Sequence, residues 1–396
     1  MQIDRYIAPP GARAPGLFER PVWGLGFRPF FLLAGAFAAL WLVLWLLALF
    51  VARLPLAASG ADWHAHEMVF GFGVAVLAGF LLTAARNWTK QRTPTGGRLA
   101  GLALLWLLGR LVMLVGARLP GWLVATVDVA FLPVFALFLA LPLWRAGSRR
   151  NYPFVALLLA LGGVNVLFHL EPLLRLWTMT VAVEVMVVFL VVMGGRVIPF
   201  FTRNALPGAR VRSWPWLDAL AIASSVAYPL VQLGGLGRAS DLVALLAAAS
   251  NLARLAGWDS LRTRRAPILW VLHLGYLWIG VGYLLLGLGR WVPALYGSAP
   301  LHALTVGALG TLTLGMMARV SLGHTGRPLT LPRSMSVAFG LVTVGALARV
   351  VLPLASPHLL TGALVVSGIA WSCAFALFVA VYWPILTRPR VDGAPG

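Results

Sequence analysis

The feature that most constrains this chain is the recurrence of apolar stretches about twenty residues long, from one end of the sequence to the other. Each stretch is long enough to cross the hydrocarbon core of a bilayer as a helix. Of the 396 residues, 60% are hydrophobic and only 11% are charged, less than half the charged fraction of a typical soluble domain. The sequence therefore predicts an all-α, polytopic transmembrane helix bundle whose partner is the lipid bilayer.

Turn signals rich in proline and glycine divide the apolar stretches into about twelve spans. We expect one integral membrane domain over residues 1–396, with a polar segment at 1–26 and the helix bundle over 27–386. The predicted spans are 27–53, 65–85, 99–117, 121–143, 152–174, 177–202, 214–235, 238–257, 266–289, 300–321, 334–355 and 359–386.

The net charge of +20 comes mostly from arginines in the short segments between spans. Placing the N-terminus, every second loop and the C-terminus in the cytoplasm puts most of the 31 basic residues on that side, as the positive-inside rule requires. We therefore expect both termini in the cytoplasm. A basic chain can also bind nucleic acid, but these charges follow the alternation of the loops, so no nucleic-acid partner is expected.

The motif Trp63-His64-Ala65-His66-Glu67-Met68 places two imidazoles and a carboxylate at the start of the second span. Ionisable groups at that depth are costly and mark functional sites by default. Because successive helical residues turn by about 100°, His64 and His66 point to nearly opposite sides of the helix. They are therefore expected to serve two centres, or one as a metal ligand and the other as its supporting partner. Glu67 is a candidate to carry protons.

Most of the other histidines fall on the same, outer face of the membrane in this topology. His169 lies near the outer end of the fifth span, with Asn165 one turn earlier, and His302 opens the tenth span before a glycine-rich stretch that suits a close neighbour or a flat ligand. Imidazole binds haem iron and copper. A boundary histidine is also often a simple interfacial polar group, which is the reading that suits His358. The single cysteine, Cys373, excludes cysteine-based iron–sulfur and zinc frameworks.

Two further groups within the spans, one pair and one single residue, each have a functional and a structural interpretation. His273 and Tyr276 share one helix face. They are either a metal ligand with a nearby phenol or a buried hydrogen-bonded pair. Glu184 lies well inside the sixth span. It is either part of a proton relay or a structural hydrogen-bond partner.

The inner ends of the spans carry a second constellation of glycines, a proline and arginines. Arg196 and Arg319 could bind haem propionates or another anion, and His324 is a further candidate ligand. Arg86 and Arg327 are better explained as positive-inside anchors and loop caps.

Taken together, these motifs resemble the NnrS family over about residues 20–390. The resemblance rests on the 63–68 motif, the runs 79–84, 87–88, 194–202 and 323–327, and the segments 273–276 and 302–307. It implies a protein of the bacterial cytoplasmic membrane that contains haem and copper and acts in nitric oxide metabolism and resistance to nitrosative stress. Twelve helices with a His-x-His pair also resemble haem–copper oxidases and nitric oxide reductases, an analogy of architecture that does not establish chemistry.

The resemblance and the histidine pattern together predict an oxidoreductase that acts on nitric oxide at a His-ligated metal site in the outer leaflet. Haem, expected to be b-type, and copper are the implied cofactors, and quinol is the implied electron donor. The expected ligands are His64, His66, His169 and His302, followed by His273 and His324, with Glu67, Glu184 and Tyr276 in proton or electron transfer. The competing hypothesis is a non-enzymatic transporter or sensor that binds nitric oxide, copper or a metal–nitrosyl species.

Overall fold

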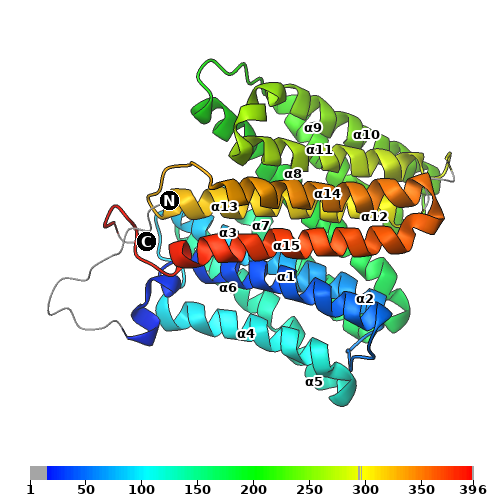
Figure 1. Cartoon of the computed structure of the whole chain (residues 1–396), viewed down its shortest axis with the longest axis horizontal. Coiled ribbons are helices and arrows are strands. Elements are labelled where there is room, and N and C mark those ends of the chain that lie inside the picture. The colour runs from blue at the N-terminus through cyan, green and yellow to red at the C-terminus, as the bar shows by residue number, and fades with distance from the viewer. Residues whose placement is uncertain (1–15, 293–294, 296, 395–396) are drawn as a thin grey trace. The chain divides into compact units, whose positions relative to one another are not determined.

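The computed structural model describes residues 16–292, 295 and 297–394. Within those residues all regular structure is helical, which confirms the predicted all-α class. Twelve helical spans in this part of the chain are long and apolar enough to cross a membrane, so the predicted span count is also confirmed (Figure 1). They are Phe27–Phe50, Gly60–Thr89, Gly96–Arg118, Gly121–Arg145, Arg149–Leu170, Pro172–Ala205, Pro215–Leu233, Gly237–Ala256, Pro267–Leu288, Ala299–His324, Arg333–Ala355 and Pro357–Leu386. The cytoplasmic placement of the termini stays a prediction.

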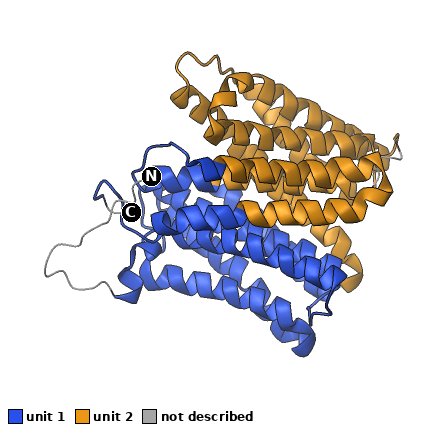
Figure 2. Cartoon of the chain, viewed as in Figure 1, with its two compact units in different colours: residues 1–170, 317–335, 375–396 blue, residues 171–316, 336–374 orange. Residues whose placement is uncertain are grey.

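The chain divides into two compact units (Figure 2). Unit 1 comprises residues 1–170, 317–335 and 375–396, and unit 2 comprises 171–316 and 336–374. A division by contacts does not test whether either part folds alone, because both are built from spans that need the bilayer. The predicted single membrane domain therefore stays a prediction.

Unit 1 contains seven complete α-helices, some of which join into one span. They are α1 (Phe27–Phe50), α2 (Gly60–His66), α3 (Val74–Thr89), α4 (Gly96–Val115), α5 (Gly121–Val129), α6 (Phe131–Arg145) and α7 (Tyr152–Leu170). Helix α1 packs on α3, α4 on α5, and α6 on both α3 and α7. Lipid tails are as apolar as leucine, so close van der Waals packing must hold such helices together. Gly79 permits that packing, since a Cβ there would lie only 2.8 Å from the ring of Phe31.

Unit 2 is built around α8 (Arg175–Ala205), α9 (Pro215–Leu233), α10 (Gly237–Ala256), α11 (Pro267–Leu288) and α12 (Ala299–His302). Helix α10 packs against both α9 and α11, and α8 packs against α9 and α11. The remaining spans contain α13 (Thr311–His324), α14 (Arg333–Ala355) and α15 (Leu360–Leu386), each of which has residues in both units.

Two spans contain a π-helical turn that begins directly after a histidine. Glu67–Gly73 follows His66 in unit 1, and Ala303–Gly310 follows His302 in unit 2. A π-helical turn changes the backbone hydrogen-bond register and occurs frequently at functional sites. Both turns therefore direct attention to the histidine that precedes them.

The first π-helical turn is held by its neighbours at Gly71. The carbonyl of Gly71 accepts a hydrogen bond from the indole N–H of Trp106 on α4, at 3.0 Å. A Cβ at Gly71 would lie 2.6 Å from the ring of Phe37 and 3.3 Å from Cδ of Arg110. Only glycine fits between these two side chains, so the turn fixes where the preceding residues Glu67 and His66 stand relative to α4.

Candidate metal centre

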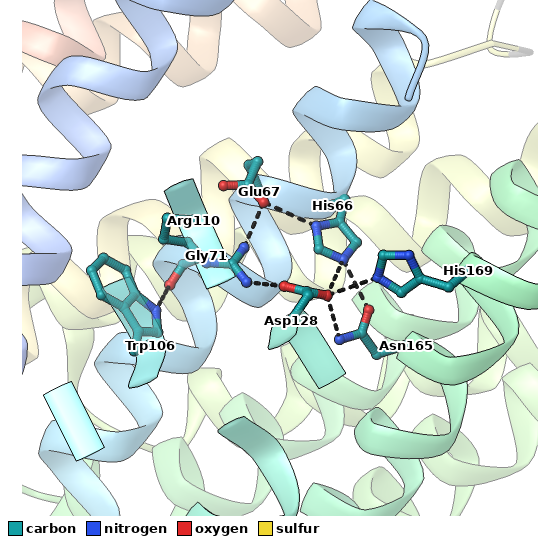
Figure 3. A network of polar contacts seen from close by, with 8 residues as sticks. All are labelled: His66, Glu67, Gly71, Trp106, Arg110, Asp128, Asn165 and His169. Atoms are coloured by element: carbon teal, nitrogen blue, oxygen red, sulfur yellow. Dashed lines mark hydrogen bonds and ion pairs between the residues drawn. The ribbon is translucent and has the colours of Figure 1, made fainter. Parts of the chain in front are cut away.

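Six polar side chains from four segments of unit 1 meet in one buried cluster (Figure 3). Each comes from near the same end of its span, and the predicted topology makes that end the outer one. The members are His66 at the end of α2, Glu67 at the start of the π-helical turn, Arg110 on α4, Asp128 on α5, and Asn165 and His169 one turn apart on α7.

Asp128 is the centre of the cluster. Its Oδ2 lies 3.1 Å from Nε2 of His66 and 3.0 Å from Nε2 of His169, and it accepts a 2.8 Å hydrogen bond from the amide of Asn165. Its other oxygen, Oδ1, accepts from the guanidinium of Arg110. Asp128 thus joins three helices through one carboxylate.

Glu67 closes the other side of the cluster. Its Oε1 accepts from Nη1 of Arg110 at 2.5 Å and lies 3.0 Å from Nδ1 of His66. Its second oxygen, Oε2, is buried and has no partner among the described residues. Arg110 therefore bridges the two carboxylates, and Glu67 keeps an oxygen that can accept one more hydrogen bond or a proton.

The charges of the cluster do not balance without a further cation. Glu67, Arg110 and Asp128 are each no more than 2% exposed. Two carboxylates and one guanidinium leave one unpaired negative charge, and an unpaired buried charge is strongly unfavourable. A protonated imidazole, a proton on Glu67 or a bound metal cation removes this imbalance.

The surroundings of His66 narrow that choice. Nδ1 faces Glu67, while Nε2 faces Asp128 and also lies 2.9 Å from Oδ1 of Asn165. Neutral imidazole has one N–H, so it cannot donate to oxygens on both sides. Both nitrogens are satisfied in an imidazolium, or in a histidine that donates Nδ1–H to Glu67 and binds a metal through Nε2. The second arrangement is the carboxylate–histidine–metal relay of many metal sites.

The donor atoms suit one metal ion. His66, Asp128 and His169 each offer a ligand atom, and the three atoms lie within 4.8 Å of one another. Ligands at right angles around a metal at about 2.1 Å are about 3 Å apart, which is the separation of Asp128 Oδ2 from each imidazole nitrogen. In the described part of the chain this is the one group of three such residues. Two imidazoles and a carboxylate are a donor set for copper, zinc or non-haem iron.

His64 stands apart from this cluster. Its ring stacks on the indole of Trp45 in α1, with 4.1 Å between centroids. His66 instead faces α5 and α7, so the two histidines contact different helices, as the helical turn predicts. The prediction of His64 as a ligand stays open, and it does not share the site of His66.

The predicted residues of unit 2 do not gather into one site. His302 donates Nδ1–H to the carbonyl of Ser298 at 2.7 Å. His273 lies between two hydroxyl groups, with Nε2 2.9 Å from Thr202 and Nδ1 2.8 Å from Ser260. Both of its nitrogens are therefore occupied.

His273 and Tyr276 do not form the predicted pair, because each side chain has hydrogen-bond partners of its own. The hydroxyl of Tyr276 donates to Oδ1 of Asn251 at 2.6 Å and accepts from Arg254 at 2.6 Å. Arg254 also donates to Asp218 at 2.8 Å. The phenol is thus part of an arginine network, not of a histidine site.

The remaining predicted residues occupy other places in the two units. Glu184 is buried in α8 and accepts a 2.9 Å hydrogen bond from the hydroxyl of Tyr283. His324 ends α13, with its ring 5.6 Å from that of Phe27. Arg319 is buried in α13 and Arg196 is half-buried in α8, and neither is part of the histidine cluster.

Sequence reasoning missed Asp128 and gave Arg110 no role. A signal was present, because Asp128 is the only carboxylate in its span and Arg110 the only cation well inside its own. Ionisable side chains within spans pair with one another. Asn165 was expected beside His169, but its amide instead binds Asp128 and His66.

The fold and the cluster together define a multi-pass membrane protein with a buried histidine–carboxylate site. The comparison with family models then gives the particular family. Residues 21–390 match the model described as NnrS protein, nearly the whole chain. The chain belongs to the NnrS family, which confirms the resemblance found in its motifs. A comparison with curated proteins gave no match.

Proposed function

We propose that this chain is a metalloprotein of nitric oxide metabolism in the bacterial cytoplasmic membrane. In this proposal it reduces nitric oxide at copper held by His66, Asp128 and His169. Membership of the NnrS family supports the link with nitric oxide. The observation that carries the proposal is the convergence of these three donors, from three helices of one unit, within 4.8 Å of one another.

Copper fits the donors and charges of this cluster. Imidazole is a preferred copper ligand, and a carboxylate completes a mixed nitrogen and oxygen set. The unpaired negative charge left by Glu67, Arg110 and Asp128 is neutralised by a bound cation. Copper would supply one-electron redox chemistry and an open position for nitric oxide.

The protein's own side chains would fix the ligands and handle protons. Glu67 accepts from Nδ1 of His66 and so keeps Nε2 available as a ligand. Arg110 holds Glu67 and Asp128 in place. The free Oε2 of Glu67 is the group of the cluster best placed to pass protons. The overall reaction balances with a quinol as reductant, since two nitric oxide molecules and one quinol give nitrous oxide, water and quinone.

The surroundings of His302 suit a haem less well than the histidine cluster suits copper. The glycine face that follows this histidine is filled. A Cβ at Gly307 would lie 2.6 Å from the indole of Trp278, and one at Gly310 would lie 2.3 Å from that of Trp371. Indoles thus occupy the close approach that a flat macrocycle would need.

The test removes each ligand and measures copper and turnover separately. We expect His66→Gln and His169→Gln in the full-length, detergent-purified protein to lower copper content to background and to abolish anaerobic nitric oxide consumption with reduced quinol. His358→Gln is the matched control, because it removes an exposed histidine from the short 3-10 helix Pro357–Leu359. Full copper content in both ligand variants would overturn the metal site.

Turnover by the wild-type protein distinguishes the enzyme from the alternative function. If copper binds to this cluster but no quinol supports nitric oxide consumption, the reductase proposal fails. Quinol-independent movement of copper or a nitrosyl species into vesicles would then identify a transporter.

A further inference from the structure

Four arginines lie at one end of unit 1, remote in sequence and apart from the histidine cluster. The predicted topology places this end on the cytoplasmic side. They come from the start of α1, the end of α3, the segment after α13 and the segment after α15, and are Arg28, Arg86, Arg327 and Arg390.

Arg28 is fully buried, which is unusual for an arginine at a membrane boundary. Its Nη1 donates to the carbonyls of Leu386 and Arg388, at 2.9 and 2.7 Å. Its Nε and Nη2 are also buried, and no described residue accepts a hydrogen bond from either. A positive-inside anchor normally extends its charge into water, so Arg28 needs another explanation.

The neighbours of Arg28 add positive charge instead of neutralising it. Arg327 and Arg390 lie close enough to Arg28 to repel its charge, and Arg28, Arg86 and Arg390 act in the same way on His324. Arg28 also stands in the first turn of α1, where the helix dipole favours anions and disfavours cations.

Within the described part of the arginine cluster there is one carboxylate, that of Asp392. Both oxygens of Asp392 accept from Arg390, at 2.9 and 2.5 Å. Beside the cluster, Arg390 lines a hollow of about 370 Å³ together with Arg20, Glu19 and Trp23. Glu19 accepts a hydrogen bond from its own chain at Gly16. Among the described residues at this end of unit 1, guanidinium groups therefore outnumber carboxylates.

We propose that Arg28, Arg86, Arg327 and Arg390 form a binding site for a phosphate group, carried by an anionic phospholipid head group or by free phosphate. A phosphate offers several acceptor oxygens, which the planar fork of arginine matches in pairs. Basic pockets between spans on the cytoplasmic side are places where anionic head groups bind. The buried N–H groups of Arg28 would gain acceptors, and the excess positive charge would be neutralised.

Asp392 acts in this site as an internal competitor for the phosphate. Its hydrogen bonds with Arg390 lower the pKa of its carboxyl to about 2, so it is ionised at every physiological pH. It occupies the guanidinium fork that a phosphate oxygen would use. Removing its charge is therefore expected to tighten phosphate binding, whereas removing an arginine is expected to weaken it.

The experiment titrates the delipidated, full-length protein in detergent at constant ionic strength and counts bound ligand by native mass spectrometry. Phosphatidylglycerol is the anionic lipid, phosphatidylcholine the zwitterionic control lipid, and inorganic phosphate the free anion. Arg28→Gln and Arg327→Gln should each weaken binding about tenfold, the loss of one charged hydrogen bond. Asp392→Asn should tighten it. Arg145→Gln is the matched control, because Arg145 is exposed at the end of α6 and predicted on the same side.

The outcomes separate the two sources and can overturn the proposal. Binding of phosphatidylglycerol, but not phosphatidylcholine, that inorganic phosphate does not displace supports a lipid site. Binding of inorganic phosphate by itself, weakened in the arginine variants, supports a free-anion site. Because Arg28→Gln also loses two hydrogen bonds to the C-terminal segment and could unfold, Arg327→Gln carries the conclusion if it does. Equal binding by wild type, Arg327→Gln and Arg145→Gln for both ligands overturns the proposal.

Discussion

Each unit has a polar network around a buried arginine, Arg110 in unit 1 and Arg254 in unit 2, and the two networks differ in charge. In unit 1, Arg110 faces two carboxylates and two imidazoles lie beside them. In unit 2, Arg254 faces one carboxylate, Asp218, and its other partners are neutral. The unit 1 network has one more negative than positive charge and three donor atoms close together, whereas the unit 2 network pairs its arginine with one carboxylate. With the proposed function, this difference places cation binding in unit 1 and a bracing role in the network of unit 2.

Removing Asp128 should have the largest effect on this comparison. Asp128→Asn leaves Arg110 without one of its two charged partners in a fully buried place, which is expected to cost about 3–5 kcal/mol of unfolding free energy. Copper content should fall to background, since the variant also loses the central ligand. Thermal unfolding in detergent and metal analysis measure the two effects.

A double variant separates the structural loss from the loss of the metal. Arg110→Met with Asp128→Leu removes both charges and leaves Glu67 beside His66. We expect this protein to recover much of the stability, because apolar residues of similar volume often replace buried ion pairs without cost. It should still bind no copper. Recovery of copper binding would show that Asp128 is not a ligand.

Tyr276→Phe should give an intermediate effect in the network of unit 2. Without the hydroxyl, Arg254 loses an acceptor and Asn251 loses a donor, both in buried places. The expected cost is about 1–3 kcal/mol of unfolding free energy. Copper content should not change. A variant with normal stability that consumes no nitric oxide would instead give the phenol a role in electron or proton transfer.

Glu184→Gln should produce the smallest change in stability. Glutamine keeps a carbonyl to accept from Tyr283, so we expect a change of about 1 kcal/mol or less. An amide cannot release a proton, so nitric oxide consumption should fall while copper content stays the same, if unit 2 supplies protons. Unchanged turnover would leave Glu184 as a structural hydrogen-bond acceptor and would complete the contrast between the two units.

The candidate site was only partly predictable. The motif at 63–68 indicates His66 and Glu67. His169 is indicated by its own position near the outer end of a span. Asp128, which holds these residues together, was visible only as an isolated charge in an apolar span. Pairing between helices depends on how far each helix is rotated about its own axis, and one sequence does not fix that rotation.

The glycine-rich stretch after His302 illustrates the same limit. Its composition allowed either a close neighbour or a flat ligand, since both need a face without side chains. The structure fills that face with the indoles of Trp278 and Trp371, which belong to other helices. The glycine content predicts that another group packs closely against this helix face, but it does not say whether that group is a side chain or a ligand.

By itself, the sequence determined the helical class, the twelve spans and the family, because hydropathy and helix length are local properties that a bilayer selects strongly. Only the tertiary structure decided that His66 and His169 share Asp128 while His64 faces α1, and that Arg28 has buried N–H groups without acceptors. Those outcomes depend on contacts between segments up to 360 residues apart. Such contacts are set by packing between helices, and no local pattern in the chain encodes them.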